Sequence, residues 1–136
     1  MPESLKLERL TMLKPRRVRK IKWLYRLFDR VNAKYFDGKL PLLRIKISKN
    51  EINCCGAFLW DSWVDKNKCR IIFNGELVKV ATDGKLEETM KHEMAHYEFY
   101  LKDKNCGDGD AIFEKRLSEL KCNPIAISSD GACYRF

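Results

Sequence analysis

The segment from Lys85 to Leu101 constrains the fold most, because it combines a helical pattern of apolar residues with both histidines of the chain. At about 100° per residue, the apolar side chains fall on one face: Leu86, Met90, Met94, Tyr97 and Leu101. His92 and His96 fall on a different face, with Lys85 and Thr89. We therefore predict a helix that packs against a core along one face and presents two imidazoles from another.

Residues 92–96 read His-Glu-Met-Ala-His, which is the H-E-x-x-H pattern of zinc hydrolases. Helix positions four apart are neighbours, ~5–6 Å between Cβ atoms, so both imidazoles can reach one zinc ion at ~2.0–2.1 Å. Glu93 lies about 100° further round the helix than His92. There it can take a proton from a zinc-bound water without being a ligand. The pattern predicts peptide-bond hydrolysis; two ordinary histidines on a helix surface are the alternative.

A catalytic zinc ion needs a third protein ligand, and the chain has no third histidine. One candidate is a glutamate of the following helix, either Glu114 or Glu119. The other candidates lie in the loop Cys106-Gly107-Asp108-Gly109-Asp110, which offers a soft thiolate and two hard carboxylates. Asp110 has a second interpretation as a helix cap. From the residues alone, these candidates stay open.

Two further alternatives concern the class of site. Asp103, Asn105 and Glu114 match three positions of a calcium-binding loop, but the glycine required at its sixth position is Asp108 here. The second alternative is a deformylase, an H-E-x-x-H enzyme that acts on a small formylated peptide. The additional glycine-rich and cysteine motifs of the deformylase family are absent from this chain.

Two more helices are predicted from apolar periodicity. The first runs from about Arg16 to Phe36 and is followed by the helix-stopping residues Gly38 and Pro41. Its predicted inner face consists of Val18, Ile21, Leu24, Phe28, Val31 and Tyr35. The second lies near Asp110 to Leu120, and a short strand is expected after it at Ile125–Ile127.

Three strands are predicted between the first two helices. Leu42 to Ser48 alternates between apolar and polar residues, as a half-buried strand does. Two more strands are expected near Gly56–Trp60 and Cys69–Asn74, and Asn74-Gly75 is interpreted as the turn that ends the last one. Trp63, in the polar loop between them, is either a substrate or partner contact or a core residue of a folded-back loop.

The order helix, strands, helix, helix predicts an α+β domain. We expect an N-terminal helix, a small three- to four-stranded sheet, the H-E-x-x-H helix and a C-terminal helix. The length of 136 residues fits one domain. We expect residues 1–15 to be a leader of uncertain structure and residues 16–136 to form the single domain.

The composition of the chain indicates where in the cell the protein is expected. No stretch approaches the ~18 apolar residues of a membrane span, and the N-terminus has no apolar signal segment, so we expect no membrane association. Six cysteines without C-x-x-C spacing argue against a zinc ribbon and for reduced thiols. We therefore expect an intracellular protein, cytoplasmic if it is bacterial or viral, with a nuclear location as an option if it is eukaryotic.

The net charge of +8 is concentrated near the N-terminus, where Lys14 to Arg30 contains eight cations against Asp29 alone. Cations that neutralise phosphates give sequence-independent affinity for nucleic acid, and Trp23 among them can stack on an unpaired base. The predicted nucleic-acid-binding residues are Arg16, Arg17, Arg19, Lys20, Lys22, Trp23, Arg26 and Arg30. A solvated cationic helix face is the alternative.

Three motifs resemble one known family. The first motif ends the first predicted helix and reads Asn32-x-x-Tyr35-Phe36-x-Gly38-x-Leu40-Pro41. The second lies in the predicted strands and consists of Cys54-Cys55-Gly56-Ala57 and Ile71-x-Phe73-Asn74. The third lies in the H-E-x-x-H helix and reads Leu86-x-x-Thr89-Met90-x-His92-Glu93-Met94-Ala95-His96, with Phe113 at a fitting sequence distance beyond it. Over roughly residues 20 to 125 the chain resembles the SprT-like family, which includes Spartan proteases. Together these motifs are much more specific than H-E-x-x-H alone.

The resemblance implies a zincin-like minimal SprT domain that cuts DNA-bound or DNA-crosslinked proteins. It implies protein substrates, a zinc cofactor and DNA, single-stranded or at junctions, as a partner. His92 and His96 then bind zinc and Glu93 is catalytic. The family's third ligand is a histidine a few residues before the phenylalanine, and Asp108 falls at that position here. Asp108 is therefore the expected third ligand; a decayed site on a non-catalytic nucleic-acid-binding module is the alternative.

Overall fold

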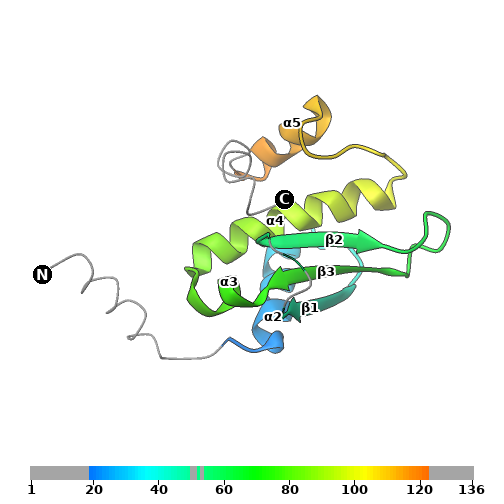
Figure 1. Ribbon diagram of the computed structural model, residues 1–136. Helices are drawn as coiled ribbons and strands as arrows, with labels where there is room; N and C mark the ends of the chain where they lie inside the picture. Colours follow the sequence, from blue (N-terminus) through cyan, green and yellow to red (C-terminus); the bar gives the residue numbers. More distant parts are fainter. Residues whose placement is uncertain (1–18, 50–51, 53, 123–136) are drawn as a thin grey trace, which may run out of the picture.

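The computed structural model describes residues 19–49, 52 and 54–122, which form helices around one small sheet (Figure 1). The strands are β1 (Arg44–Ser48), β2 (Gly56–Trp60) and β3 (Cys69–Asn74), in the order β1-β3-β2. Strand β1 is parallel and β2 antiparallel to β3. The helices are α2 (Ile21–Tyr35), α3 (Gly75–Val80), α4 (Asp83–Leu101) and α5 (Ala111–Glu119).

The predicted α+β class is confirmed. The predicted leader at residues 1–15 and strand at Ile125–Ile127 lie outside the described residues.

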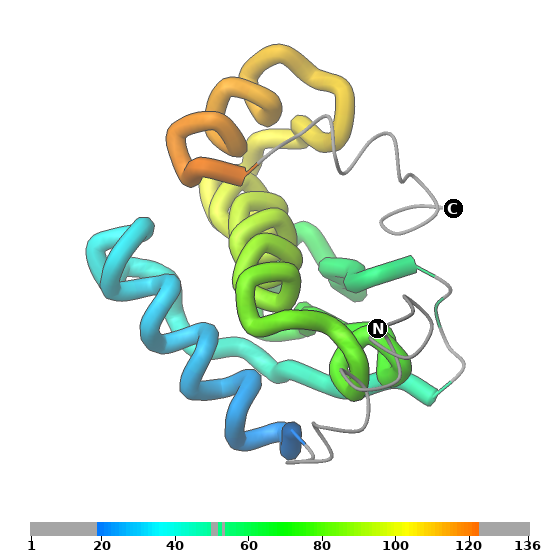
Figure 2. Tube along the Cα trace, turned by 90° about the vertical axis from the view of Figure 1, so that its left-hand side faces the viewer, coloured from blue at the N-terminus to red at the C-terminus, as the bar shows by residue number. Residues whose placement is uncertain are grey.

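Helix α4 is the central element, because it contacts α2, the edge strand β2 and α5. Figure 2 shows α2 on one side of α4 and β2 on the other. Of the predicted stripe, Leu86, Met90, Met94 and Tyr97 are buried, and Leu101 at the end of the helix is partly buried. However, Thr89 and His92, assigned by the sequence pattern to a face apart from the core, are buried as well. The reason is that β2 covers Thr89, while Phe113 of α5 packs against His92.

The start of α4 differs slightly from the prediction. The side chain of Thr82 accepts a hydrogen bond from the backbone N–H of Lys85 at 3.1 Å and so caps the helix. The helix therefore begins at Asp83 rather than Lys85, and Gly84 lies inside its first turn. It ends at Leu101, as predicted.

Helix α2 begins at Ile21, later than the predicted start at Arg16. Lys20 has an extended backbone, and its carbonyl accepts a hydrogen bond from Trp23 N at 2.8 Å, which opens the helix there. Residues 16–18 lie outside the described part of the chain. The buried face includes the predicted Leu24, Phe28 and Val31 and adds Leu27, whereas Ile21 is exposed.

The loop after α2 is held by the side chain of Asn32. Its amide donates to Leu40 O at 2.9 Å, and its Oδ1 accepts from Leu40 N at 3.1 Å. Asp37 and Gly38 both have positive φ, 56° and 68°, so the chain reverses between these two anchor points. The helix ends at Tyr35, one residue before the prediction. The chain then enters β1 at Arg44, two residues after the predicted start.

Strands β2 and β3 have the predicted ends, but the turn expected at Asn74-Gly75 is the start of a helix that the sequence interpretation missed. Asn74 caps α3 by accepting from Glu76 N and Leu77 N at 2.8 and 3.2 Å. A Cβ on Gly75 would stand 2.4 Å from the Ser48 carbonyl oxygen. The glycine therefore permits close packing of α3 against the end of β1.

Helix α5 spans Ala111–Glu119 within the predicted range Asp110 to Leu120 and buries Phe113 and Leu117 against α4. None of the helices in the described residues has the length and apolarity that crossing a membrane requires.

Candidate active site

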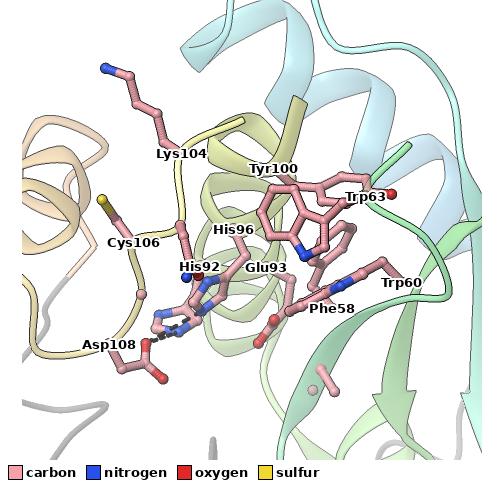
Figure 3. Close-up of a pocket in the computed structure, with 14 residues that line it drawn as sticks. Phe58, Trp60, Trp63, His92, Glu93, His96, Tyr100, Lys104, Cys106 and Asp108 are labelled. Carbon is pink, nitrogen blue, oxygen red and sulfur yellow. Dashed lines mark ion pairs between the residues drawn. The ribbon is translucent and has the colours of Figure 1, made fainter. Parts of the chain in front are cut away.

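Two imidazoles and one carboxylate converge at the C-terminal half of α4 (Figure 3). The distance from Asp108 Oδ1 to His92 Nε2 is 3.0 Å, and to His96 Nε2 it is 3.3 Å. One ligand atom from each of the three residues lies within 4.8 Å of the others. The structure thus brings together the residues that the sequence interpretation assigned to one metal.

The spacing of these atoms fits a zinc ion. Two ligands that are each ~2.0–2.1 Å from a tetrahedral zinc lie roughly 3.4 Å apart, close to the observed 3.0 and 3.3 Å. Two imidazole nitrogens with one carboxylate oxygen also form a donor set that catalytic zinc sites use. The three side chains can therefore hold a divalent metal without a change of fold.

A short turn presents Asp108 to the histidines. Gly107 N donates to Asp110 Oδ2 at 2.8 Å, and Gly109 N donates to Glu114 Oε2 at 3.2 Å. Gly109 has a φ of 91°, which favours glycine. Asp110 occupies the N-cap position of α5, but its side chain bonds to Gly107 and makes no capping bond to the helix. Both carboxylates, proposed as alternative ligands, instead brace the loop of Asp108.

The other candidate ligands lie outside the His92, His96 and Asp108 group. Glu119 forms an ion pair with Arg116 at 3.1 Å, and Asp103, a residue of the calcium alternative, pairs with Lys66 at 2.7 Å. Cys106 lines the same cleft as the histidines. Of the five described cysteines, Cys106 is partly exposed and the other four are buried, as small apolar residues would be.

Phe113 supports the histidine pair from α5. Its ring stacks on His96, with centroids 4.3 Å apart, and meets His92 edge-on at 5.5 Å. Phe99 of α4 in turn meets the Phe113 ring edge-on, with centroids 5.6 Å apart. The orientation of both imidazoles is thus fixed by packing as well as by Asp108.

The electrostatics of the group are strongly coupled. Burial opposes a charge on His92, but the hydrogen bond to Asp108 and the charge of Glu93 outweigh it, so the pKa of His92 lies above its ordinary value. Burial likewise opposes ionisation of Asp108, but hydrogen bonds from His92 and His96 hold its pKa well below the usual range. Asp108 is therefore an ionised oxygen donor at neutral pH.

Glu93 lies in the floor of the cleft and is 2% exposed. Burial raises its pKa above the ordinary glutamate value. Strand β2 approaches it closely at Gly56, where an added Cβ would stand 3.0 Å from Thr89 Cγ2 and 3.5 Å from Glu93 Cγ. A buried carboxylate with a raised pKa, beside three side chains that can hold a metal, has the properties of a general acid–base.

The opposite wall of the cleft is aromatic, and the sequence interpretation largely missed it. Phe58, Trp60, Trp63 and Tyr100 line the same cavity as Glu93 and the histidines (Figure 3). Trp63 had two open interpretations, and it lies on the cleft with its ring 5.0 Å from Tyr100. The signal in the sequence was the pair of tryptophans around a polar loop, but their partner Tyr100 is distant in the chain.

A sequence profile described as the SprT-like family matches residues 24–130. The chain belongs to the SprT-like family. Comparison with curated proteins finds no match. Within this SprT-like domain, the side chain of Asn32 holds the loop after α2. Tyr97 of α4 secures the same loop by donating to Pro41 O at 2.9 Å.

The predicted nucleic-acid-binding residues of this SprT-like domain divide into three groups. Arg16 and Arg17 lie outside the described residues. Arg19 is engaged internally, since it donates to Val78 O at 2.8 Å and pairs with Asp83 at 2.6 Å, and its guanidinium lies 4.9 Å from the ring centroid of half-buried Trp23. The remaining cations are exposed on or next to α2: Lys20, Lys22, Arg26 and Arg30.

Proposed function

We propose that this chain is a zinc-dependent endopeptidase of the SprT-like type. The observation that carries the proposal is the convergence of His92, His96 and Asp108 on one point beside the buried Glu93. Membership of the SprT-like family supports it independently. The three converging side chains are the proposed metal ligands, and Glu93 is the proposed general base.

In this proposal, the metal and the side chains of the site have separate roles. Bound zinc would supply a Lewis acid that polarises a carbonyl and lowers the pKa of water. Glu93 accepts a proton from the attacking water and delivers it to the amine that leaves. Its raised pKa suits this task, because the carboxylate must hold the proton between the two steps. Strand β2 is at the edge of the sheet, so its outer backbone groups can pair with an extended substrate.

The test of this function is cleavage of an unfolded protein by the zinc-loaded chain, with the Glu93→Gln variant as control. Gln has nearly the same shape but cannot take up the proton. We expect wild-type cleavage and a loss of about 10²–10⁴-fold in the variant, with unchanged zinc content. Equal cleavage by both proteins would reject Glu93 as the base, and no cleavage by either would reject the peptidase.

We further propose that the substrates are DNA-associated proteins. The cations Lys22, Arg26 and Arg30 support this, because they are exposed and recur every fourth residue along α2. Changing all three to Gln should weaken DNA binding and reduce the slope of log affinity against log salt. The matched control changes three exposed lysines elsewhere, Lys39, Lys68 and Lys115, to Gln. An equal effect in both triple variants would show that net charge alone, rather than the α2 face, attracts DNA.

A second candidate is a non-catalytic nucleic-acid-binding module on the same scaffold. It is favoured by one observation, a carboxylate at the position where the family pattern has a histidine ligand. This candidate predicts DNA binding without stoichiometric zinc, together with identical behaviour of wild type and Glu93→Gln in every proteolysis assay.

A further inference from the structure

The cleft beside Glu93 has two chemically different walls. Its volume is about 270 Å³, far above the ~30 Å³ that one water occupies in the liquid. The histidines and Asp108 line one side, and Figure 3 shows the aromatic side chains gathered on the other, with Glu93 between them. Trp60 and Trp63 are 43% and 38% exposed, so their surfaces face solvent in the described structure.

The aromatic wall, made of Phe58, Trp60, Trp63 and Tyr100, is packed as a unit. Trp60 and Trp63 are 5.6 Å apart, and Tyr100 lies 5.8 Å and 5.0 Å from them respectively. Phe58 joins the group at 5.8 Å from Trp60 and 5.3 Å from Tyr100. The planes are inclined by 30° to 70° in these contacts. Such mutual packing gives a preformed apolar surface rather than separate mobile side chains.

Hydrogen bonds hold the loop of the aromatic wall in place. The hydroxyl of Tyr100 donates to Ser62 O, which ties the loop after β2 to α4. The Ser62 hydroxyl in turn accepts from Val64 N and Asp65 N at 3.0 and 2.9 Å. The position of Trp63 is therefore set by the loop backbone, and the wall can bind without first becoming ordered.

The charged groups around the aromatic wall determine which kind of substrate group can bind there. Lys66 Nζ already lies 4.4 Å from the Trp63 ring centroid and 4.2 Å from that of Tyr100, and it pairs with Asp103 at 2.7 Å. A substrate cation would meet this ammonium group at the same rings. A phosphate gains little either, because Lys66 is already paired with Asp103 and the carboxylates of Glu93 and Asp108 line the same cleft. A neutral, large apolar group suits the wall best.

We propose that the aromatic wall is a specificity subsite that takes a large apolar side chain, such as Phe, Leu or Met, next to the substrate bond that is cut. This inference rests on the proposed peptidase function and deepens it. The wall is continuous with the cleft of Glu93 and with edge strand β2, so a peptide paired with β2 places alternate side chains toward it.

The experiment uses blocked octapeptides of Ala and Ser in which one position at a time carries Phe, Leu, Met, Asp or Lys. Cleavage by the zinc-loaded full chain gives kcat/KM, and dye-labelled peptides give affinity for the zinc-loaded Glu93→Gln variant. Burying one large apolar side chain should raise both by about tenfold to a hundredfold over Ala or Asp at one position. Trp60→Ser and Trp63→Leu should each reduce this preference. Val64→Ser is the matched control, because Val64 is 92% exposed on the same loop and does not line the cleft.

Each outcome decides one of the two proposals. Cleavage without an apolar preference, or with a preference that both tryptophan variants keep, overturns the subsite and leaves the peptidase standing. If no peptide is cleaved, the peptidase fails, and binding decides the subsite: an apolar preference that depends on the tryptophans supports it, and its absence overturns it. A wall-dependent preference for Lys, or for an oligo(dT) octamer over every peptide, also overturns it, because the occupant would then be different.

Discussion

The ring of Phe113 stacks on the imidazole of His96, with centroids 4.3 Å apart and planes inclined by 21°. Phe113 is fully buried, and it also meets His92 edge-on. Because the turn that carries Asp108 leads directly into the helix of Phe113, one helix positions both the third candidate ligand and the packing partner of the first two.

Replacing Phe113 with Leu should therefore affect metal binding as well as stability. Loss of the aromatic contact should lower metal affinity by about 10–100-fold, the usual effect of removing support from a ligand. Chelator competition measures the affinity, and denaturant unfolding measures stability. Leu117→Ala is the control, because Leu117 is equally buried on α5 and has no ring contact with the histidines. It should cost about 2–5 kcal/mol of stability and leave the affinity unchanged; equal losses of affinity would contradict the special role of Phe113.

The close approach of β2 to α4 gives a second prediction. A Cβ on Gly56 would stand 3.0 Å from Thr89 Cγ2 and 3.3 Å from Ile72 O, so Gly56→Ala should push the strand from the helix and cost about 1–3 kcal/mol. Thr89→Ser removes the methyl group that the new Cβ meets. It keeps the hydroxyl that donates to Lys85 O at 2.9 Å. The double variant should recover part of the loss in unfolding experiments, whereas simple additivity would show that the contact is unimportant.

Thiol chemistry tests the burial of the cysteines. Burial raises the pKa of Cys122 to about 12 and also raises that of Cys69. Since a raised pKa means less thiolate at any given pH, both should resist alkylation at about pH 8, where a model thiol of pKa ~8.5 reacts. Iodoacetamide labelling followed by peptide mapping should find Cys106 modified first among the described cysteines. Rapid labelling of Cys122 in the folded protein would contradict its burial beside Glu88 of α4.

Much of the fold was predictable because local signals agreed with the final structure. Strands β2 and β3 end where the sequence interpretation placed them, since Gly56 and Asn74-Gly75 interrupt the chain beside them. Helix α4 was equally clear from its apolar spacing and its motif. The first helix was predicted to begin too early, because Val18 fits the apolar spacing of the helix, while the extended backbone of Lys20 sets the actual start at Ile21.

What the sequence could not supply was contact between distant segments. Helix α3 was missed because Asn74-Gly75 is typical of a turn, and the need for glycine comes from the Ser48 carbonyl on another strand. The aromatic wall depends on Tyr100 meeting Ser62, which is separated from it by 38 positions. The burial of His92 likewise depends on Phe113 of α5. Asp108 was chosen from the family resemblance, because local spacing left five candidates open.

The chemistry at position 108 gives a further prediction. Asp108→His restores the family pattern, and an imidazole is an accepted third ligand for zinc. We expect this variant to bind zinc and to retain proteolysis, because the turn is braced by Glu114 and Asp110 rather than by the side chain at 108. Metal titration and the cleavage assay measure the two effects. A variant that folds but binds no metal would mean that the position does not face the ion.

The most direct test of the proposed metal site is the zinc content of the purified, dialysed protein, with wild type beside His96→Ala, Asp108→Ala and Glu114→Gln. We predict about one zinc per chain in the wild type, loss in His96→Ala and Asp108→Ala, and retention in Glu114→Gln, whose amide oxygen can still accept from Gly109 N. Zinc retained in Asp108→Ala, or no zinc in the wild type after loading, would contradict the assignment of His92, His96 and Asp108 as the metal ligands.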